Sequence, residues 1–282
     1  MKRTNQNPIQ SILEKQGVLI LDGGISNALE ARGCDLADEL WSAKVLLEAP
    51  DMLREVHLDY LKAGADCIAT ASYQATLPGF RNRGLDDDAA RAVLALSVGL
   101  ALEAREAFWG EGSDREGRLE PLVAASIGPY GAFLADGSEY TGRYGISDQE
   151  LYDFHRERWH ILAQAGADLI ACETIPGKGE AEVLLDLLSE TPNQWAWISF
   201  SCRDGEHLSD GGLLRDASQA CDSEPRVVAV GVNCTAPELI PSLIGEARKG
   251  TDKPIFVYPN SGEVYDAGKK QWHSTPSSTP LD

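Results

Sequence analysis

Three residues whose side chains could bind a metal ion or a substrate lie at or just after the end of a short apolar run. Cys234 follows a run that ends in Asn233, Glu173 ends a second run, and Asp22 ends a third. A thiolate in such a place can hold a metal ion or attack a substrate, and a carboxylate can accept hydrogen bonds from an ammonium group. We predict a functional role for Glu173. A buried structural cysteine and a tight turn with a helix-capping acid remain alternatives for Cys234 and Asp22.

Other polar residues follow the same kind of run. Gly23 and Gly24 would let a ligand approach the backbone, and Ser72 and Tyr73 belong to a cluster of hydroxyl and amide side chains at 70–76. Such a cluster suits a pocket for a polar small molecule, although a capped loop explains it nearly as well. The Gly-rich and aromatic stretch 128–140 could cover a site as a lid.

Strands and helices that would position these residues alternate along the chain. The apolar runs are continuous, which is typical of parallel strands covered on both faces, and they lie at 18–22, 66–70, 122–127, 169–173, 195–201, 227–233 and 255–259. Helical patterns lie between them, at 50–63, 87–108, 147–165, 179–188 and 237–248. Ser147 and Glu150 have the spacing of a capping box. A repeated Ala-Gly-Ala-Asp predicts left-handed glycine caps at Gly64 and Gly166.

This alternation predicts an α/β fold. Because no GxGxxG follows the first run, a β/α barrel is favoured over a dinucleotide-binding sheet. In a barrel, functional residues gather at the carboxyl ends of the strands, which is where the residues above lie. We expect one barrel domain over 1–273 and a polar tail rich in Ser, Thr and Pro over 274–282.

Composition limits the partners. The chain of 282 residues carries 25 Lys and Arg against 44 Asp and Glu, a formal charge of −19. So acidic a protein repels phosphate backbones and anionic lipids, so we expect neither nucleic acid nor membrane as a partner. The polar N-terminus and six scattered cysteines, without CxxC pairs, predict a cytoplasmic protein with reduced thiols.

Taken together, the motifs resemble those of homocysteine S-methyltransferases, in particular the bacterial type that uses S-methylmethionine. The resemblance covers roughly residues 10 to 273 and rests on Asp22-Gly23-Gly24, Asp35-Leu36-Ala37-Asp38-Glu39-Leu40-Trp41-Ser42, Thr70-Ala71-Ser72-Tyr73-Gln74, Gly128-Pro129-Tyr130-Gly131, Cys172-Glu173-Thr174, His207-Leu208-Ser209-Asp210-Gly211 and Gly231-Val232-Asn233-Cys234.

The resemblance implies a (β/α)8 TIM-type barrel that makes methionine from homocysteine. It implies a Zn²⁺ ion that is bound by three cysteine thiolates, one of them Cys234, and that activates the homocysteine thiol. Glu173 would anchor the homocysteine ammonium group, and Asp22 would do the same or shape the turn beside it. The other residues expected to bind substrate are Gly23, Gly24, Ser72, Tyr73 and Asn233. No catalytic base is assigned, because the thioether that leaves a sulfonium donor is already neutral.

The sequence departs from the family pattern near its end. The family has two further zinc ligands in a Gly-Gly-Cys-Cys motif after the eighth strand, whereas this sequence has no cysteine beyond Cys234 and only seven strand patterns. We therefore expect a barrel that lacks its last strand and helix, through a chain cut short, and a metal site that lacks two of its three ligands. Cys202 and His207 are the only candidates to replace them.

Three hypotheses follow. The first is a methyltransferase with S-methylmethionine or S-adenosylmethionine as donor, between which the sequence does not choose. The second is an inactive remnant that binds an amino acid without turnover. The third, a barrel lyase or aldolase, is disfavoured because no strand pattern ends in the lysine that a Schiff base requires.

Overall fold

A computed structural model describes residues 6–36, 38, 40–111, 117–260, 264–266 and 271–273. The chain forms two compact units. Unit 1 comprises Met1–Ile127, Arg156–Ala171 and Asn193–Trp195, and unit 2 comprises Gly128–His155, Cys172–Pro192 and Ala196–Asp282. One strand and one helix pass from one unit into the other, so the units share secondary structure as well as chain connections.

Six strands form one sheet in the order of the chain, and the pairs β1–β2, β4–β5 and β5–β6 are parallel. Their bounds are β1 Cys67–Ala69, β2 Leu122–Ile127, β3 Leu169–Ile175, β4 Ala196–Phe200, β5 Val227–Asn233 and β6 Ile255–Tyr258. All six lie within or extend the predicted runs. A short antiparallel pair, β7 (Val264–Asp266) with β8 (Gln271–His273), was not predicted. The predicted tail, 274–282, lies outside the described residues.

The first predicted strand, 18–22, is wrong in its extent. Only Leu21 forms a bridge, to Cys67. The backbone N–H of Ile20 bonds to the side chain of Asp66 instead of to a strand partner, and the Val18 and Ile20 side chains are 57% and 53% exposed. An apolar run therefore indicated a buried strand where the chain has an exposed extended segment.

The predicted helices are present, with small shifts at their ends. The α-helices are α1 Gln10–Gln16, α2 Ile25–Glu30, α3 Val45–Glu48, α4 Pro50–Ala63, α5 Leu77–Asn82, α6 Asp87–Glu111, α7 Tyr130–Leu134, α8 Asp148–Gln164, α9 Lys178–Ser189, α10 Leu214–Asp222 and α11 Ile240–Gly250. Three short 3-10 helices are η1 Trp41–Lys44, η2 Ser138–Tyr140 and η3 Pro237–Leu239. Among the described helices, none combines the length and the apolar character needed to cross a membrane.

The predicted caps are confirmed. Gly64 and Gly166 have φ values of 116° and 104°, the left-handed conformation that glycine adopts without a Cβ clash. Before α8, the Ser147 N–H and hydroxyl both donate to the Glu150 carboxylate, and the Glu150 N–H donates back to the Ser147 hydroxyl. These bonds satisfy donors that an uncapped helix would leave exposed.

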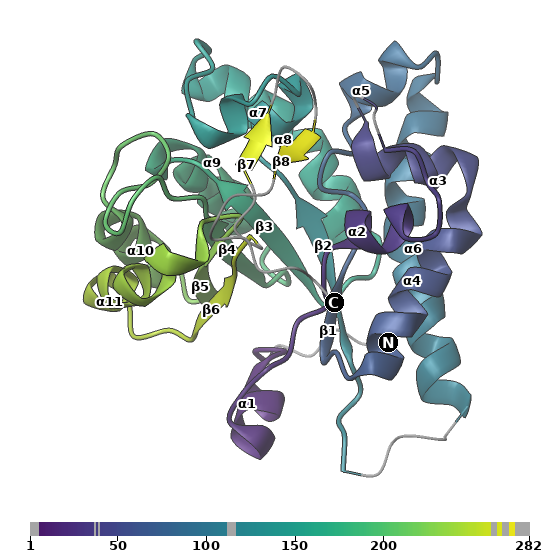
Figure 1. The fold of residues 1–282 in the computed structure, drawn as a ribbon, viewed down its shortest axis with the longest axis horizontal. Helices are drawn as coiled ribbons and strands as arrows, with labels where there is room; N and C mark the ends of the chain where they lie inside the picture. Colours follow the sequence, from purple (N-terminus) through teal and green to yellow (C-terminus); the bar gives the residue numbers. More distant parts are fainter. Residues whose placement is uncertain are drawn as a thin grey trace. The chain divides into compact units, whose positions relative to one another are not determined.

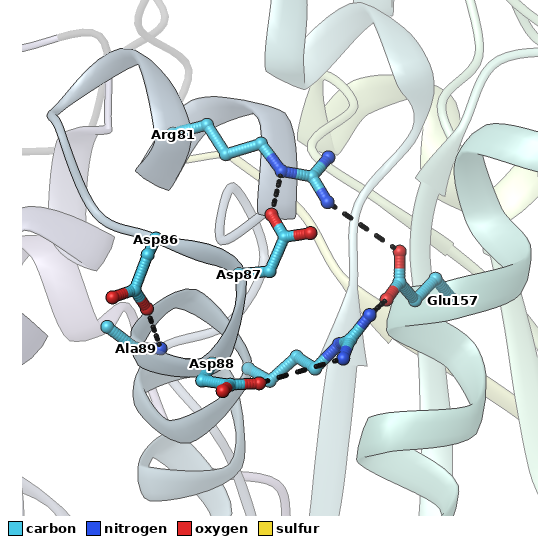
Figure 2. Close-up of polar contacts among 7 residues, drawn as sticks. Arg81, Asp86, Asp87, Asp88, Ala89 and Glu157 are labelled. Atoms are coloured by element: carbon cyan, nitrogen blue, oxygen red, sulfur yellow. Dashed lines mark hydrogen bonds and ion pairs between the residues drawn. The ribbon is translucent and has the colours of Figure 1, made fainter.

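In unit 1, α4 packs along α6, which Figure 1 shows at the right of the view. An exposed group of ion pairs holds α6 to the later part of α8 (Figure 2): Glu157 accepts from Arg91 on α6 and also faces Arg81 on α5. Asp87, in the first turn of α6, accepts from Arg81 at 2.6 Å. Exposed pairs of this kind add little stability individually.

In unit 2, the strands β4 and β5 are completely buried, and α10 and α11 pack together beside β5 (Figure 1). Continuous burial explains why these runs are apolar at every position rather than at alternate ones. The carboxyl ends of β3, β4, β5 and β6 all belong to this unit. Unit 2 therefore contains the strand ends that carry Glu173 and Cys234.

Candidate functional site

The site of unit 2 is built on the carboxyl ends of β3 and β5. Glu173 lies near the end of β3, and Cys234 is the first residue after β5. Thr174 and Cys234 both have positive φ, 60° and 47°. Left-handed backbone at a residue with a Cβ costs on the order of 1 kcal/mol and persists where neighbouring contacts hold it.

The Asn233 side chain provides those contacts. Its Oδ1 accepts from the Thr174 N–H at 2.8 Å, and its Nδ2 donates to Thr174 Oγ1 at 2.8 Å and to Cys234 Sγ at 3.3 Å. Thr174 Oγ1 lies 3.6 Å from the same sulfur. Since Asn233 is 1% exposed, its amide joins two strand ends in a place that water does not reach. It thereby orients the Cys234 thiol and the backbone that carries Glu173.

The next strand holds the other side of Cys234. The Cys234 N–H donates to the Tyr258 carbonyl at the end of β6, at 3.2 Å. Gly231 makes this approach possible, because a Cβ there would lie 2.5 Å from the Phe256 carbonyl oxygen. The glycine of the Gly-Val-Asn-Cys motif is thus a packing requirement of β5 against β6.

The site favours neutral side chains. Burial, with the charges of Glu173 and Glu139, raises the pKa of the Cys234 thiol to about 11. Burial and the charge of Glu173 also raise the pKa of Tyr258 well above its usual value. The pKa of Glu139 is raised to about 7, chiefly by burial and next by the charge of Asp136. At neutral pH the Cys234 sulfur is therefore a protonated thiol unless a cation stabilises the thiolate.

Cys202 and His207 do not join this sulfur in a metal site. Burial, followed by the charge of Asp204, raises the pKa of Cys202 to about 12. His207 Nδ1 bonds to the Asp204 carboxylate at 3.0 Å. Among the described residues, no group of three His, Cys, Asp or Glu is placed to hold a metal ion. The replacement ligands considered from the sequence are therefore not assembled there.

A three-thiolate zinc site does not fit the residues in place. Cys234 is the one thiol at the strand ends of β3 and β5, and its described polar contacts are a hydroxyl and an amide N–H. Neither is a usual zinc ligand, and tetrahedral zinc sites normally use three or four protein ligands. Cys234 thus provides at most one of the ligands that the family pattern requires.

In unit 1, the predicted residues Asp22, Gly23 and Gly24 pack around Tyr60. Asp22 Oδ2 accepts from the Ala69 N–H at 2.9 Å, and the Tyr60 hydroxyl donates to the Gly24 carbonyl at 3.0 Å. A Cβ at Gly23 would lie 2.9 Å from the Tyr60 ring. Gly23 therefore has a structural reason for its type, and contact of either glycine with substrate stays a prediction.

Ser72 and Tyr73 follow β1 in the same unit. Ser72 is fully buried; its hydroxyl lies 2.6 Å from Thr70 Oγ1 and donates to the Ser126 carbonyl at 2.7 Å. Tyr73 is half-buried, and its ring packs edge-on against Trp41. The structure thus gives Ser72 a bracing role between β1 and β2. Substrate contact by either residue stays a prediction.

Sequence reasoning missed several residues of the unit 2 site. Thr174 holds the Cys234 sulfur and the Asn233 amide, and Glu139 adds a second carboxylate to the surroundings of the thiol. Thr174 follows the predicted Glu173 directly, so its position was a usable signal. Glu139 lies in the stretch predicted to be a lid, and nothing in its local sequence distinguishes it from an exposed acid.

A cavity of about 230 Å³ lies at the turn after β3 in unit 2, and Glu173, Asn233 and Cys234 are not among the residues that line it. The segments that line it are the loop before α8, the turn between β3 and α9, and the Asp210 loop, with Gly142, Tyr144, Pro176, Gly177, Glu180 and Asp210 among the lining residues.

Comparisons with known proteins agree over nearly the whole chain. The family described as Homocysteine S-methyltransferase matches residues 19–278. Homocysteine S-methyltransferase YbgG of Bacillus subtilis is 53% identical over 267 residues, 95% of this chain and 85% of the relative. Homocysteine S-methyltransferase of Escherichia coli is 53% identical over 270 residues, 96% and 86% of the two chains. The crystal structure of metallated homocysteine methyltransferase MmuM from Escherichia coli matches with a TM-score of 0.86, at 53% identity, over 91% of this chain and 88% of that chain.

Proposed function

This chain belongs to the homocysteine S-methyltransferase family, and from that premise we propose that it converts homocysteine to methionine with a methyl-sulfonium donor. The observation that carries the proposal is the pairing of Glu173 and Cys234 at two strand ends that one buried amide, that of Asn233, joins. The high identity to relatives named homocysteine S-methyltransferase supports it and lends no support to an inactive amino-acid-binding remnant. We further propose that the sheet is part of a β/α barrel of the TIM type.

The reaction is a transfer of one methyl group between two sulfur atoms. A lone pair on the homocysteine sulfur forms a bond to the methyl carbon, and the bond from that carbon to the sulfonium sulfur breaks. Its electron pair stays with the departing thioether, and the thiol proton goes to solvent. With S-methylmethionine as donor, both products are methionine; we propose it ahead of S-adenosylmethionine because the motifs resemble the S-methylmethionine-dependent type.

In this proposal Glu173 binds the ammonium group of homocysteine. A carboxylate that is already fixed on a strand orients the substrate without a further loss of entropy. Asp22 is proposed as a second acid for the same group, although its Oδ2 already accepts from the Ala69 N–H. Gly23, Gly24, Ser72, Tyr73 and Asn233 remain proposed substrate-binding residues.

The metal is the point at which this chain and its family disagree. The family is zinc-dependent in general, and zinc lowers the pKa of a bound thiol. The thiolate set that the resemblance implies is not assembled from the described residues of this chain, so no step is derived through the ion. Zinc per chain, determined by elemental analysis of dialysed protein, is therefore the first measurement. About one zinc ion per chain would overturn the assignment of Cys234 as the only ligand, and substoichiometric zinc would support it.

Activity is tested by methionine formation from homocysteine with each donor, with and without added Zn²⁺. We expect turnover with S-methylmethionine, and its loss in C234S. The matched control is C34S, because Cys34 is also partly exposed but lies in unit 1. Absence of methionine with either donor in the presence of zinc, from protein with a cooperative unfolding transition, would refute the proposed function.

A further inference from the structure

A buried carboxylate in unit 2 has no part in the reaction described above. Glu180 lies in the first turn of α9, and its side chain is 3% exposed. Three groups, two from the stretch before α8 and one from α8 itself, bond to it. The Tyr130 N–H donates to Oε1 at 2.7 Å, the Tyr144 hydroxyl donates to Oε2 at 2.8 Å, and His155 Nε2 lies 2.8 Å from Oε1. The Tyr130 N–H and the Tyr144 hydroxyl are donors to this carboxylate, and the role of His155 Nε2 depends on the tautomer of its ring.

Both donors belong to one stretch, residues 130–147, here called the covering segment. It contains α7, η2 and the loop that leads to α8. Gly131 lets the stretch fold back on itself, because a Cβ there would lie 2.3 Å from the Glu139 backbone nitrogen. Glu180 bonds to the covering segment near both ends, at Tyr130 and at Tyr144, and therefore holds it as a whole rather than at one point.

Aromatic contacts pack the covering segment onto the start of α8. The Tyr130 ring centroid lies 5.3 Å from that of Tyr144 and 4.7 Å from that of Phe154, both in edge-on geometry. Phe154 precedes His155, whose Nε2 lies 2.8 Å from Glu180 Oε1. The aromatic contacts join the covering segment to α8. The Glu180 carboxylate, which accepts from Tyr130 and Tyr144, joins the segment to α9.

The covering segment reaches the strand ends of the site. Gly142, within it, has φ +63°, and a Cβ there would lie 3.4 Å from the Pro176 side chain, two residues after Thr174. Tyr144 and Glu180 both line the cavity beside β3, together with Pro176 and Gly177. A shift of the covering segment would therefore change the wall of that cavity.

We propose that Glu180 is a positioning residue, which fixes the covering segment against α8 and α9 and thereby keeps the segment in place over the turn after β3, next to the strand end that carries Glu173. This proposal rests on the proposed function for the identity of the substrate, but the position of the segment is measurable without turnover. Glu180 acts through Tyr130 and Tyr144 and touches no reacting atom. Its loss should weaken substrate binding more than it slows the chemical step.

The first test is cleavage by trypsin after Arg143, an exposed residue beside Tyr144 in the covering segment. The variant Y144F removes one hydrogen bond from the segment and leaves the bond between His155 and Glu180 in place. We expect roughly tenfold faster appearance of the fragment that ends at Arg143, because proteolysis follows the population of the opened segment. The matched control is Y152F, which also removes a tyrosine hydroxyl bonded to a glutamate, Glu190, on the surface of α8. It should leave this cleavage rate unchanged.

The second test varies the acceptor. Glu180→Gln keeps one oxygen for Tyr130 and His155, and its amide N–H can donate to the Tyr144 oxygen, so E180Q should cleave close to the wild-type rate. E180A leaves buried donors without an acceptor and should cleave fastest, with E182A as control for an exposed glutamate of the same helix. Equal cleavage after Arg143 in wild type, Y144F and E180A would overturn the proposal.

Activity provides the third measurement. In Y144F we expect a rise in KM for homocysteine or donor of roughly tenfold with kcat changed less than threefold, since the lost contact orders the empty pocket. A fall in kcat with unchanged KM would contradict a positioning role. If no variant or wild type turns over, the proposed function fails, while the trypsin result still decides the role of Glu180.

Discussion

Buried side-chain hydrogen bonds brace the strand ends in both units, but only the brace of unit 2 also contacts a group that could take part in the reaction. In unit 1, Thr70 and Ser72 after β1 bond to each other and to Ser126 at the end of β2. In unit 2, Asn233, the last residue of β5, bonds to Thr174 at the end of β3. Both braces are buried side-chain hydrogen bonds, between the adjacent strands β1 and β2 in unit 1 and between β3 and β5, on either side of β4, in unit 2. In unit 2 alone the brace also contacts a thiol, that of Cys234.

The difference teaches how to interpret polar residues after buried strands. A short hydroxyl side chain there is as well explained by the need to satisfy backbone groups as by a ligand. Glu173 and Cys234 differ from such braces in side-chain type, because a carboxylate can bind an ammonium group and a thiolate can bind a metal ion.

The largest expected effect contrasts the acids of the two units. E173Q should lower kcat/KM by about a thousandfold, the cost of removing one partner of a buried charge pair, equivalent to about 4 kcal/mol. D22N should lower it by only about tenfold, because the amide oxygen can still accept from the Ala69 N–H. Steady-state kinetics with homocysteine checks both, with E238Q, at an exposed glutamate after β5, as control. Equal losses in E173Q and D22N would erase the contrast.

The next prediction compares how much each brace contributes to the free energy of unfolding. N233A leaves the Thr174 N–H and hydroxyl without their partner in a buried place, so we expect unfolding to become easier by about 3 to 4 kcal/mol. S72A removes a smaller brace and should cost about 1 kcal/mol. Urea unfolding of both variants checks the order. A larger loss in S72A than in N233A would mean that the unit 1 brace is the more important one.

A third effect contrasts a buried histidine of each unit. His155 in unit 2 bonds to Glu180, whereas neither ring nitrogen of His57, in α4 of unit 1, has a hydrogen-bond partner among the described residues. Burial lowers the pKa of His57 from 6.5 to about 4. Between these two values the unfolded chain binds more protons than the folded one, so stability falls as pH falls from about 6.5 to about 4.

The loss from His57 between pH 7 and pH 4 should be about 3 kcal/mol. The variant H57L lacks this proton, so its advantage over wild type should grow by that amount as the pH is lowered across the same window. Urea unfolding at both pH values measures the difference. A constant difference between the two proteins would show that His57 is protonated in the folded state as readily as in the unfolded one.

The smallest expected effect concerns the ion pairs of unit 1 (Figure 2). These pairs are exposed to solvent, whereas the Glu180 side chain, which accepts hydrogen bonds in unit 2, is buried. E157Q removes the negative charge that pairs with Arg91 and should lower the Tm only slightly, with the difference from wild type vanishing in 1 M salt. Thermal unfolding at low and high salt checks this. A loss that persists in high salt would indicate that Glu157 contributes by packing rather than by charge.

Much of the fold could be predicted, because periodicity is a local property. The bounds of α4, β2 and β5 agree with their patterns to the residue, since unbroken apolar runs and a proline or glycine at a helix end leave few alternatives. The segment at 18–22 could not be predicted in the same way. Its residues are as apolar as those of a buried strand, and only the packing around them decides that Val18 and Ile20 are exposed.

For the candidate site, too, some features follow from the sequence and others depend on the packing. The sequence by itself determined the residue types at the strand ends, the absence of any cysteine beyond Cys234 and the family motifs, because these depend on composition and order alone. Only the tertiary structure decided that Asn233 braces Thr174 and that Glu180 accepts hydrogen bonds from Tyr130 and Tyr144, near both ends of the covering segment. Hydrogen bonds between residues that are distant in sequence depend on how strands and helices pack, and no local pattern encodes that geometry.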